Sequence, residues 1–313
     1  MRWHQAKTLM ILLFLILNAI LGYYNFIRPS IIKTNQSWNP AVYEEALAKL
    51  AAEGIYLSNK PSEQTVELPV LRIQRLATAD SAQQLASTLL IGEADLKTEL
   101  KQTLSGDMIW QFQKDSRNLE VSSDGRYTYF DADQELENNK VIDESADIFQ
   151  IAKNFCDQHD LDLKSLLSFP VQKLGSEATL TSHLVSWYAQ YKGFPIFDAE
   201  LGVIVREGKV IILNNTLCTV VEEAEQPLWL CNATDILLRL VSDSRMQELS
   251  SRSESLGRPP QIHNLQLGYY GFNQVLSSDA NEMDLLVYPT WRVLLEGGEV
   301  LYFDALSSQR IYP

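Results

Sequence analysis

A stretch of nineteen residues near the amino terminus, residues 9–27, contains no charged side chain. As an α-helix it would be about 28 Å long, which is close to the thickness of the hydrocarbon core of a bilayer. A cleaved signal peptide has a shorter apolar stretch that is followed by small residues. Here the residues near the end of the stretch are bulky, beginning with Ile20 and Leu21. Tyr23 and Tyr24 then follow, as at a membrane–water boundary. The stretch therefore predicts an uncleaved transmembrane anchor.

The charges around this stretch favour a cytoplasmic amino terminus only slightly. Two basic residues precede the stretch and two follow it: Arg2, Lys7, Arg28 and Lys33. The positive-inside rule therefore gives a tie, which the free amino terminus breaks. No second long apolar run follows. We expect a single-pass protein of the cell membrane, with its amino terminus in the cytoplasm and its bulk outside the cell.

The composition narrows the possible functions. The 26 Lys and Arg residues against 40 Asp and Glu residues give a net charge of −14, which argues against a nucleic-acid partner because phosphates would be repelled. The 46% of hydrophobic residues suffice for ordinary cores. Three cysteines are too few for a disulfide scaffold. Cys218 and Cys231 could form one bridge outside the cell, and the sequence leaves this open.

Periodic apolar residues predict helices over residues 40–53, 82–91, 144–159 and 234–249. Asn39-Pro40 is a typical helix start and Gly54 a typical stop. The apolar face of the first helix would consist of Val42, Ala46, Leu47 and Leu50. Glu207-Gly208 and Gly297-Gly298 separate strand-like runs, which predicts two hairpins. The expected fold class is α+β: the single transmembrane helix, then antiparallel sheets with helices packed on one face.

A four-residue motif occurs three times, as Tyr129-Phe130-Asp131-Ala132, Ile196-Phe197-Asp198-Ala199 and Tyr302-Phe303-Asp304-Ala305. The first and last copies follow glycine-containing turns, so each would close a hairpin. We expect an inward aromatic side chain at a strand end and an aspartate that begins the next turn. The middle copy follows Gly-Phe-Pro and could sit differently. The copies favour an internal repeat over chance.

Two segments resemble a known family. The first is the opening of the chain, with Trp3, Lys7, Phe14-Leu15 and Leu17-Asn18. The second is residues 188–198, which read YAQYKGFPIFD. These segments resemble YycI-type regulatory proteins of the YycFG (WalKR) two-component system of Gram-positive bacteria. The helix-then-hairpin blocks resemble the PepSY-type units of the YycH/YycI extracellular region. Residues 34–110 match no family.

The resemblance implies a non-catalytic regulator of a sensor histidine kinase of the WalK/YycG type, which controls cell-wall metabolism. It implies a YycH-like sister protein as a second partner, and PepSY-like repeats in the extracellular region. We expect three parts: residues 1–33 as cytoplasmic tip and anchor, residues 34–140 as an N-terminal extracytoplasmic α+β domain, and residues 141–313 as a C-terminal domain with two PepSY-like units.

The anchor would supply the contact with the kinase and with the sister protein. Asn18 would lie at mid-membrane, where a hydrogen bond to another helix relieves an unpaired amide by roughly 1 kcal/mol. Ala19 and Gly22 are small, so a partner backbone could approach nearby. We expect a transmembrane interaction through Phe14, Asn18, Ala19 and Gly22; the alternative is that the membrane merely tolerates one amide.

Signatures of an enzyme are weak. The four histidines show no zinc-binding spacing, and the chain contains neither a Gly-x-Ser-x-Gly elbow nor a phosphate-binding loop. The cluster Cys156-Asp157-Gln158-His159-Asp160 would fan around a helix end, which favours a buried thiol and a capping histidine over a metal site. The acidic run Glu222-Glu223-Ala224-Glu225 is typical of a solvated loop. We expect no enzyme, cofactor or metal, although paired carboxylates depend on three-dimensional distance.

Two other functions fit the sequence. PepSY-type units elsewhere resemble protease propeptides, so the extracellular part could be an inhibitor of a peptidase or a chaperone-like module. It could also be the sensor of a cell-wall ligand held in a cleft between two PepSY-like lobes. A basic or aromatic-lined cleft would favour the sensor.

Overall fold

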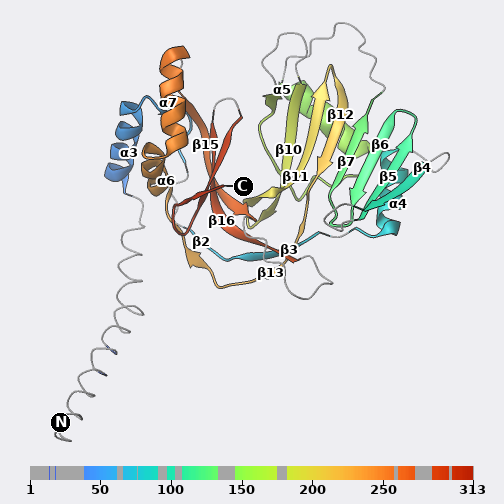
Figure 1. Ribbon diagram of the computed structural model, residues 1–313, viewed down its shortest axis with the longest axis horizontal. Helices are drawn as coiled ribbons and strands as arrows, with labels where there is room; N and C mark the ends of the chain where they lie inside the picture. Colours follow the sequence, from blue (N-terminus) through green and yellow to red (C-terminus); the bar gives the residue numbers. More distant parts are fainter. Residues whose placement is uncertain are drawn as a thin grey trace, which may run out of the picture.

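The computed structural model describes residues 14, 18, 39–61, 66–75, 77–90, 97–102, 108–132, 145–174, 182–256, 260–271, 284–295 and 298–312. Its helices are α3 (Pro40–Ala52), α4 (Ala79–Leu89), α5 (Ser145–Gln158), α6 (Ala233–Val241) and α7 (Ser244–Leu256). Its strands, labelled as in Figure 1, are β1 (Tyr56–Leu57), β2 (Glu67–Leu68), β3 (Leu71–Gln74), β4 (Lys97–Gln102), β5 (Met108–Lys114), β6 (Arg117–Ser122), β7 (Tyr127–Asp131), β8 (Leu167–Ser168), β9 (Gln172–Leu174), β10 (Ser182–Tyr191), β11 (Phe194–Arg206), β12 (Lys209–Asn215), β13 (Thr219–Glu223), β14 (Leu228–Trp229), β15 (Gln261–Tyr270), β16 (Asp284–Leu295), β17 (Val300–Asp304) and β18 (Arg310–Ile311).

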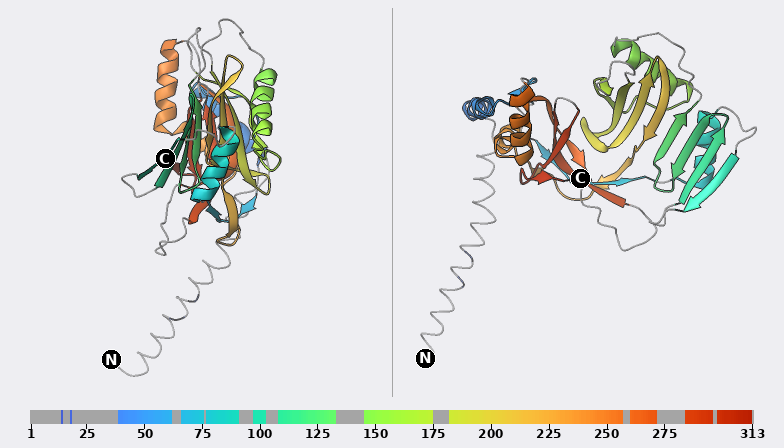
Figure 2. Two further views of the ribbon diagram at one scale, coloured as in Figure 1. Left: turned by 90° about the vertical axis from the view of Figure 1, so that its right-hand side faces the viewer. Right: turned by 45° about the horizontal axis from the view of Figure 1, so that its top comes forward.

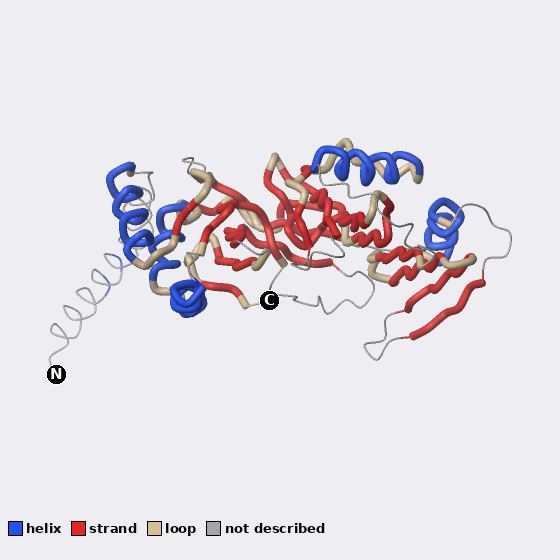
Figure 3. The backbone as a smooth tube through the Cα atoms, turned by 90° about the horizontal axis from the view of Figure 1, so that it is seen from above, coloured by secondary structure: helices blue, strands red, loops and turns tan. Residues whose placement is uncertain are grey.

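Most strands belong to one mixed sheet. Its main path runs β13-β3-β16-β15-β11-β12-β7-β6-β5-β4. The successive pairs from β11 to β4 are antiparallel. By contrast, β11 meets β15 in parallel through Ile196 and Tyr269, and β1 also pairs with β15 in parallel. The strands run through the middle of the molecule and the helices lie at its periphery (Figure 3).

Two hydrophobic cores lie on either side of the contact between β11 and β15. The terminal core contains Leu50 and Phe303 and is built mainly from α3, α6, β3 and β15–β17. The central core contains Phe112 and is built mainly from α4, α5, β5–β7 and β10–β12. After β3 the chain builds most of the central core; β10 and β11 also contribute Ala189, Ile196 and Ala199 to the terminal core, and β13 then leads back to it (Figure 2). Leu166 and Leu217 pack against both cores.

The helix termini follow their sequence signals. The side chain of Asn39 accepts a hydrogen bond from the Ala41 amide at 3.0 Å, and Gly54 adopts a φ of +74° after α3. The predicted apolar face of α3 is confirmed at Ala46, which is fully buried, and wrong at Val42, which is 39% exposed.

The helix predicted over residues 234–249 is two helices. α6 ends at Val241, and the side chain of Asp243 accepts hydrogen bonds from the amides of Arg245 and Met246. An aspartate in this position caps a new helix, so the backbone turns before α7 begins. Apolar periodicity continues across the break and does not reveal it.

The predicted α+β fold class is wrong. Strands make up 47% of the structure, and they form a large mixed sheet instead of separate antiparallel sheets. The sequence pattern of a hairpin involves only neighbouring residues and therefore predicts separate hairpins. The parallel contact between β11 and β15 joins residues that are far apart in the chain, and it connects the hairpins into one sheet.

The single transmembrane helix of the predicted fold is also not seen. Among the described residues, no helix has the length and apolar character needed to span a bilayer. Residues 9–27 lie outside the described part of the chain, except for Phe14 and Asn18. The predicted division into residues 1–33, 34–140 and 141–313 stays a prediction.

The three copies of the repeated motif sit in different environments. In the first copy Tyr129 is buried and Phe130 is 42% exposed, whereas in the last copy Phe303 is buried. Asp304 begins a turn as predicted, because its side chain accepts a hydrogen bond from the Leu306 amide at 2.9 Å. The middle copy lies inside β11 and closes no hairpin.

β11 crosses close over β15 at a glycine. A Cβ atom on Gly268 would lie 2.4 Å from the carbonyl oxygen of Pro195 and 2.6 Å from the ring of Phe197. A backbone oxygen cannot move away as a side chain can, so the crossing requires glycine here.

We therefore expect Gly268→Ala to lower the free energy of unfolding by about 3 kcal/mol, because an added methyl group overpacks the crossing. Gly202→Ala is the matched control on β11, since its Cβ would meet the nearest atom, in the Leu184 side chain, at 3.4 Å. Urea unfolding of the two variants measures the difference. Equal stability of the two would contradict the close crossing.

Candidate functional site

A buried arginine connects β16 and β15 with β10 and β11 where β11 crosses β15. Arg292 on β16 is 5% exposed, and its guanidinium carbon lies 4.3 Å from the ring centre of Phe197, 4.6 Å from that of Phe169 and 5.1 Å from that of Tyr188. Its Nη2 donates a hydrogen bond to Gln266 Oε1 at 3.2 Å. Cation–aromatic contacts strengthen to about 2 kcal/mol when they are desolvated. We call Arg292, the three aromatic residues around it and Gln266 the arginine joint.

An ion pair lies on the neighbouring side of β11. The Arg75 Nη2 atom lies 3.8 Å from Asp198 Oδ2, and the Arg75 side chain is only 9% exposed. Burial raises the pKa of Asp198, although Arg75 and the Gly271 amide oppose this shift. Arg75 Nε and Asp198 Oδ1 have no hydrogen-bond partner among the described residues. Arg75 follows β3 and Asp198 lies in β11, so this pair also connects the terminal and central parts of the fold.

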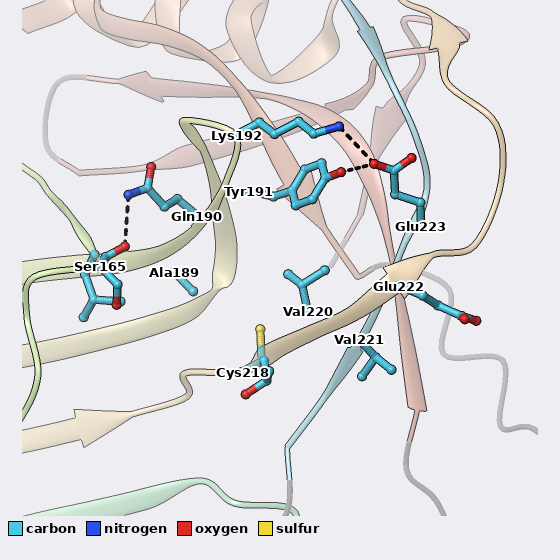
Figure 4. Close-up of a pocket in the computed structure, with 12 residues that line it drawn as sticks. Ser165, Ala189, Gln190, Tyr191, Lys192, Cys218, Val220, Val221, Glu222 and Glu223 are labelled. Atoms are coloured by element: carbon cyan, nitrogen blue, oxygen red, sulfur yellow. Dashed lines mark hydrogen bonds and ion pairs between the residues drawn. The ribbon is translucent and has the colours of Figure 1, made fainter.

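A pocket of about 540 Å³ lies beside this junction. One wall is the end of the β10–β11 hairpin with the loop before β8, and the other is β13 with the residue before it (Figure 4). A volume of this size is typical of ligand pockets. The lining residues are Ser165, Leu166, Ala189, Gln190, Tyr191, Lys192, Cys218, Thr219, Val220, Val221, Glu222 and Glu223.

A tight turn positions the polar rim of the pocket. Lys192 and Gly193 have φ values of +50° and +87°, the pair of left-handed residues that a two-residue hairpin turn requires. The turn brings the Tyr191 hydroxyl and Lys192 Nζ to Glu223 Oε1, the latter at 2.9 Å (Figure 4). The hydrogen bond from Tyr191 and then that from Lys192 lower the pKa of Glu223. The carboxylate is therefore ionised at neutral pH.

A buried hydroxyl lies under this rim. The Tyr269 ring meets the Tyr191 ring edge-on, with ring centres 6.1 Å apart, and its hydroxyl has no hydrogen-bond partner among the described residues. Burial raises the pKa of Tyr269, and the neighbouring Tyr191 and Glu223 raise it further. The hydroxyl is therefore neutral at physiological pH, and Tyr269 is not one of the residues that line the pocket.

The pocket does not have the character that would favour a cell-wall sensor. Its lining contains one aromatic ring, Tyr191, and one basic side chain, Lys192, beside the two carboxylates of Glu222 and Glu223. No group of three potential metal ligands occurs among the residues that the structure describes. The arrangement offers hydrogen bonds and charge to a bound group.

The residues predicted as a transmembrane contact do not enter this site. Phe14 and Asn18 are helical, and Phe14 is 62% exposed, while Ala19 and Gly22 lie outside the described residues. Their predicted interaction stays a prediction.

The cluster around His159 is structural. Cys156 is fully buried in the central core, and His159 Nδ1 lies 2.9 Å from the Thr88 carbonyl oxygen in the last turn of α4. The ring of His159 also packs on Phe155, with ring centres 4.5 Å apart. The buried thiol is confirmed, and the histidine meets the carboxyl end of a neighbouring helix as well as its own.

The acidic run was the sequence signal nearest to the site, and its interpretation as a solvated loop is confirmed for Glu225, which is exposed after the strand, but wrong for the backbone of Glu222 and Glu223. Glu222 and Glu223 belong to β13, and Glu222 pairs with Arg72 at 3.2 Å. Tyr191 and Lys192 lay within the family-like segment, where Lys-Gly between two alternating runs signals a turn. Nothing in the sequence pattern places this turn opposite Glu223, because thirty-one residues separate Lys192 from Glu223.

Comparison with known proteins finds similarity in fold but not in sequence family. No family model and no curated protein matches this chain. An uncharacterized protein from Eubacterium rectale ATCC 33656 is similar over 87% of this chain and 99% of its own, with a TM-score of 0.55 and 11% sequence identity. At this identity the likeness establishes a shared fold and nothing about activity.

A second solved structure is more distant. The Bacillus megaterium YpeB C-terminal domain aligns with 76% of this chain and 97% of its own, at 12% identity and a TM-score of 0.39. No comparison supports the YycI part of the expected resemblance. The TM-score is too low to establish a common fold.

The thiols give a pH-dependent test of the pocket. All three cysteines are free, and burial raises the pKa of Cys218 to about 12 and that of Cys231 to about 11. Because burial disfavours the thiolate, we expect alkylation by iodoacetamide to be slow at pH 8 and to accelerate above pH 10, first at Cys231. In 8 M urea both should react as ordinary thiols. Mass spectrometry of the alkylated peptides measures this, and rapid labelling of folded Cys218 at pH 8 would refute it.

Proposed function

We propose that this chain is a non-catalytic regulator that binds a protein partner through the pocket between the β10–β11 hairpin and β13. The observation that carries the proposal is the rim of the pocket, where Tyr191 and Lys192 reach across to Glu223. The side chains of Lys192 and Glu223 are 62% and 41% exposed. Exposed pairs contribute little to stability, so a partner can replace them at small cost.

The partner that we propose is the extracytoplasmic region of a sensor histidine kinase of the WalK/YycG type, with a YycH-like protein as a further partner. The sequence resemblance to YycI-type proteins supports this choice. The acidic net charge of −14 supports a protein partner over nucleic acid. The proposal places the bulk of the chain outside the cell, where such a kinase exposes its sensor region.

The arginine joint supports a role in which binding is transmitted through a rigid body. Arg292 holds β16 of the terminal core against the aromatic rings of Tyr188 and Phe197 in the central part of the fold. A partner in the pocket would contact both walls: the β10–β11 hairpin, which the joint contacts, and β13, which is connected to β16 through β3. Recognition would therefore depend on the relative position of the hairpin and β13.

Site-specific crosslinking in the native host tests the proposal. A photoreactive amino acid replaces Val221, which lines the pocket and is 52% exposed. We expect an adduct with the kinase from this position, because the partner would cover it. Val42 on α3, which is 39% exposed, is the matched control and should give no adduct.

Kinase output supplies the second measurement. Deletion of the gene should change transcription of the genes under kinase control during cell-wall stress, and the full-length protein should restore it. Unchanged output after deletion, or equal adducts from positions 221 and 42, would refute the proposal.

A further inference from the structure

The strand β13 offers backbone hydrogen-bonding groups to an incoming chain. It pairs with β3 on one side, and in the described part of the chain no strand pairs with its other side. Such an edge is a template for an extended peptide, whose main chain continues the sheet. All five residues of β13 line the pocket. This inference rests on the proposed function, since it names the chemistry of the segment that the pocket holds.

A bulge in β13 directs two side chains to the same side. The register with β3 shifts between Val220 and Glu222. Residues 220 and 223 would face opposite ways in a regular strand, yet both side chains point toward Tyr191 (Figure 4). Val221 points away from them and is 52% exposed. The bulge thus places an apolar and an acidic side chain together in the pocket, as bulges beside binding sites do.

The charge along this wall is acidic. Glu222 and Glu223 lie on β13, and Glu225 follows with an exposed side chain. Their basic neighbours are Arg72, paired with Glu222, and Lys192, paired with Glu223. Among the described residues, this wall therefore carries three carboxylates beside two basic side chains. This balance favours a basic segment over an acidic one.

We propose that the pocket binds an extended, lysine- or arginine-containing polypeptide segment, which adds as a strand to the free edge of β13 and pairs a basic side chain with Glu223.

Synthetic peptides test the inference with the full-length protein. The probe is a fluorescein-labelled peptide of four Lys-Val repeats, and the controls are four Glu-Val repeats and the Lys-Val peptide with every amide N-methylated. Fluorescence anisotropy at 0.15 M salt measures binding. We expect the Lys-Val peptide to bind at least about tenfold more tightly than either control, because only it supplies both the charge and the main-chain donors.

Hydrogen exchange and matched variants locate the site. The bound peptide should slow amide exchange in residues 219–223. Glu223→Gln should weaken binding about tenfold, while Glu44→Gln removes the same charge from the exposed face of α3 and should leave binding unchanged. Equal loss in the two variants would overturn the inference, because it would reduce the binding to general attraction by an acidic protein. Undiminished binding of the N-methylated peptide would also overturn it.

The two proposals fail in distinguishable ways. If position 221 crosslinks to the kinase but the Lys-Val peptide does not bind, the strand-addition inference is overturned and the proposed function stands. If the peptide binds as expected but no kinase adduct forms, the inference stands and the choice of partner falls.

Discussion

The crossing of β11 over β15 determines the arrangement of the molecule. Two structures that could be separate, a helix-covered sheet and a set of antiparallel hairpins, meet through one parallel bridge between Ile196 and Tyr269. Gly268 allows the close approach, and the Arg292 guanidinium fills the space between the two faces. A buried guanidinium is costly unless its surroundings compensate it. The faces of three aromatic rings and the amide of Gln266 supply that compensation.

The pocket is a consequence of this crossing. The β10–β11 hairpin contacts β15 at Ile196, and its turn at Lys192 and Gly193 lies opposite β13. The other wall of the pocket is β13, the strand that returns to the terminal core after the chain has completed the central core. The site therefore combines residues that are distant from one another in the sequence. Its geometry depends on the position of one sheet relative to the other.

Local signals in the sequence predicted local structure well. Asn39 and Gly54 mark the ends of α3, and Glu207-Gly208 forms the predicted turn, with φ values of +50° and +78°. The same signals could not reveal the parallel bridge at Ile196, because parallel pairing leaves no turn between the paired residues. They also could not place Glu223 beside Lys192, since this contact depends on the fused sheet. The family-like segment, residues 188–198, attracted attention for its motif. In the structure it contains both the residue that pairs with β15, Ile196, and the turn at the pocket.

Both strands that pair with β3 come much later in the chain, which has a consequence for folding during synthesis. β3 lies between β13 and β16, so Ile73 pairs with Val220 on one side and with Leu285 on the other. During synthesis this strand, with its buried Leu71 and Ile73, must wait until well over a hundred further residues have been made before either neighbour exists. Pairings between such distant segments form slowly and leave apolar edges open in the meantime. We therefore expect the nascent chain to expose Leu71 and Ile73 during this interval, a consequence of the topology.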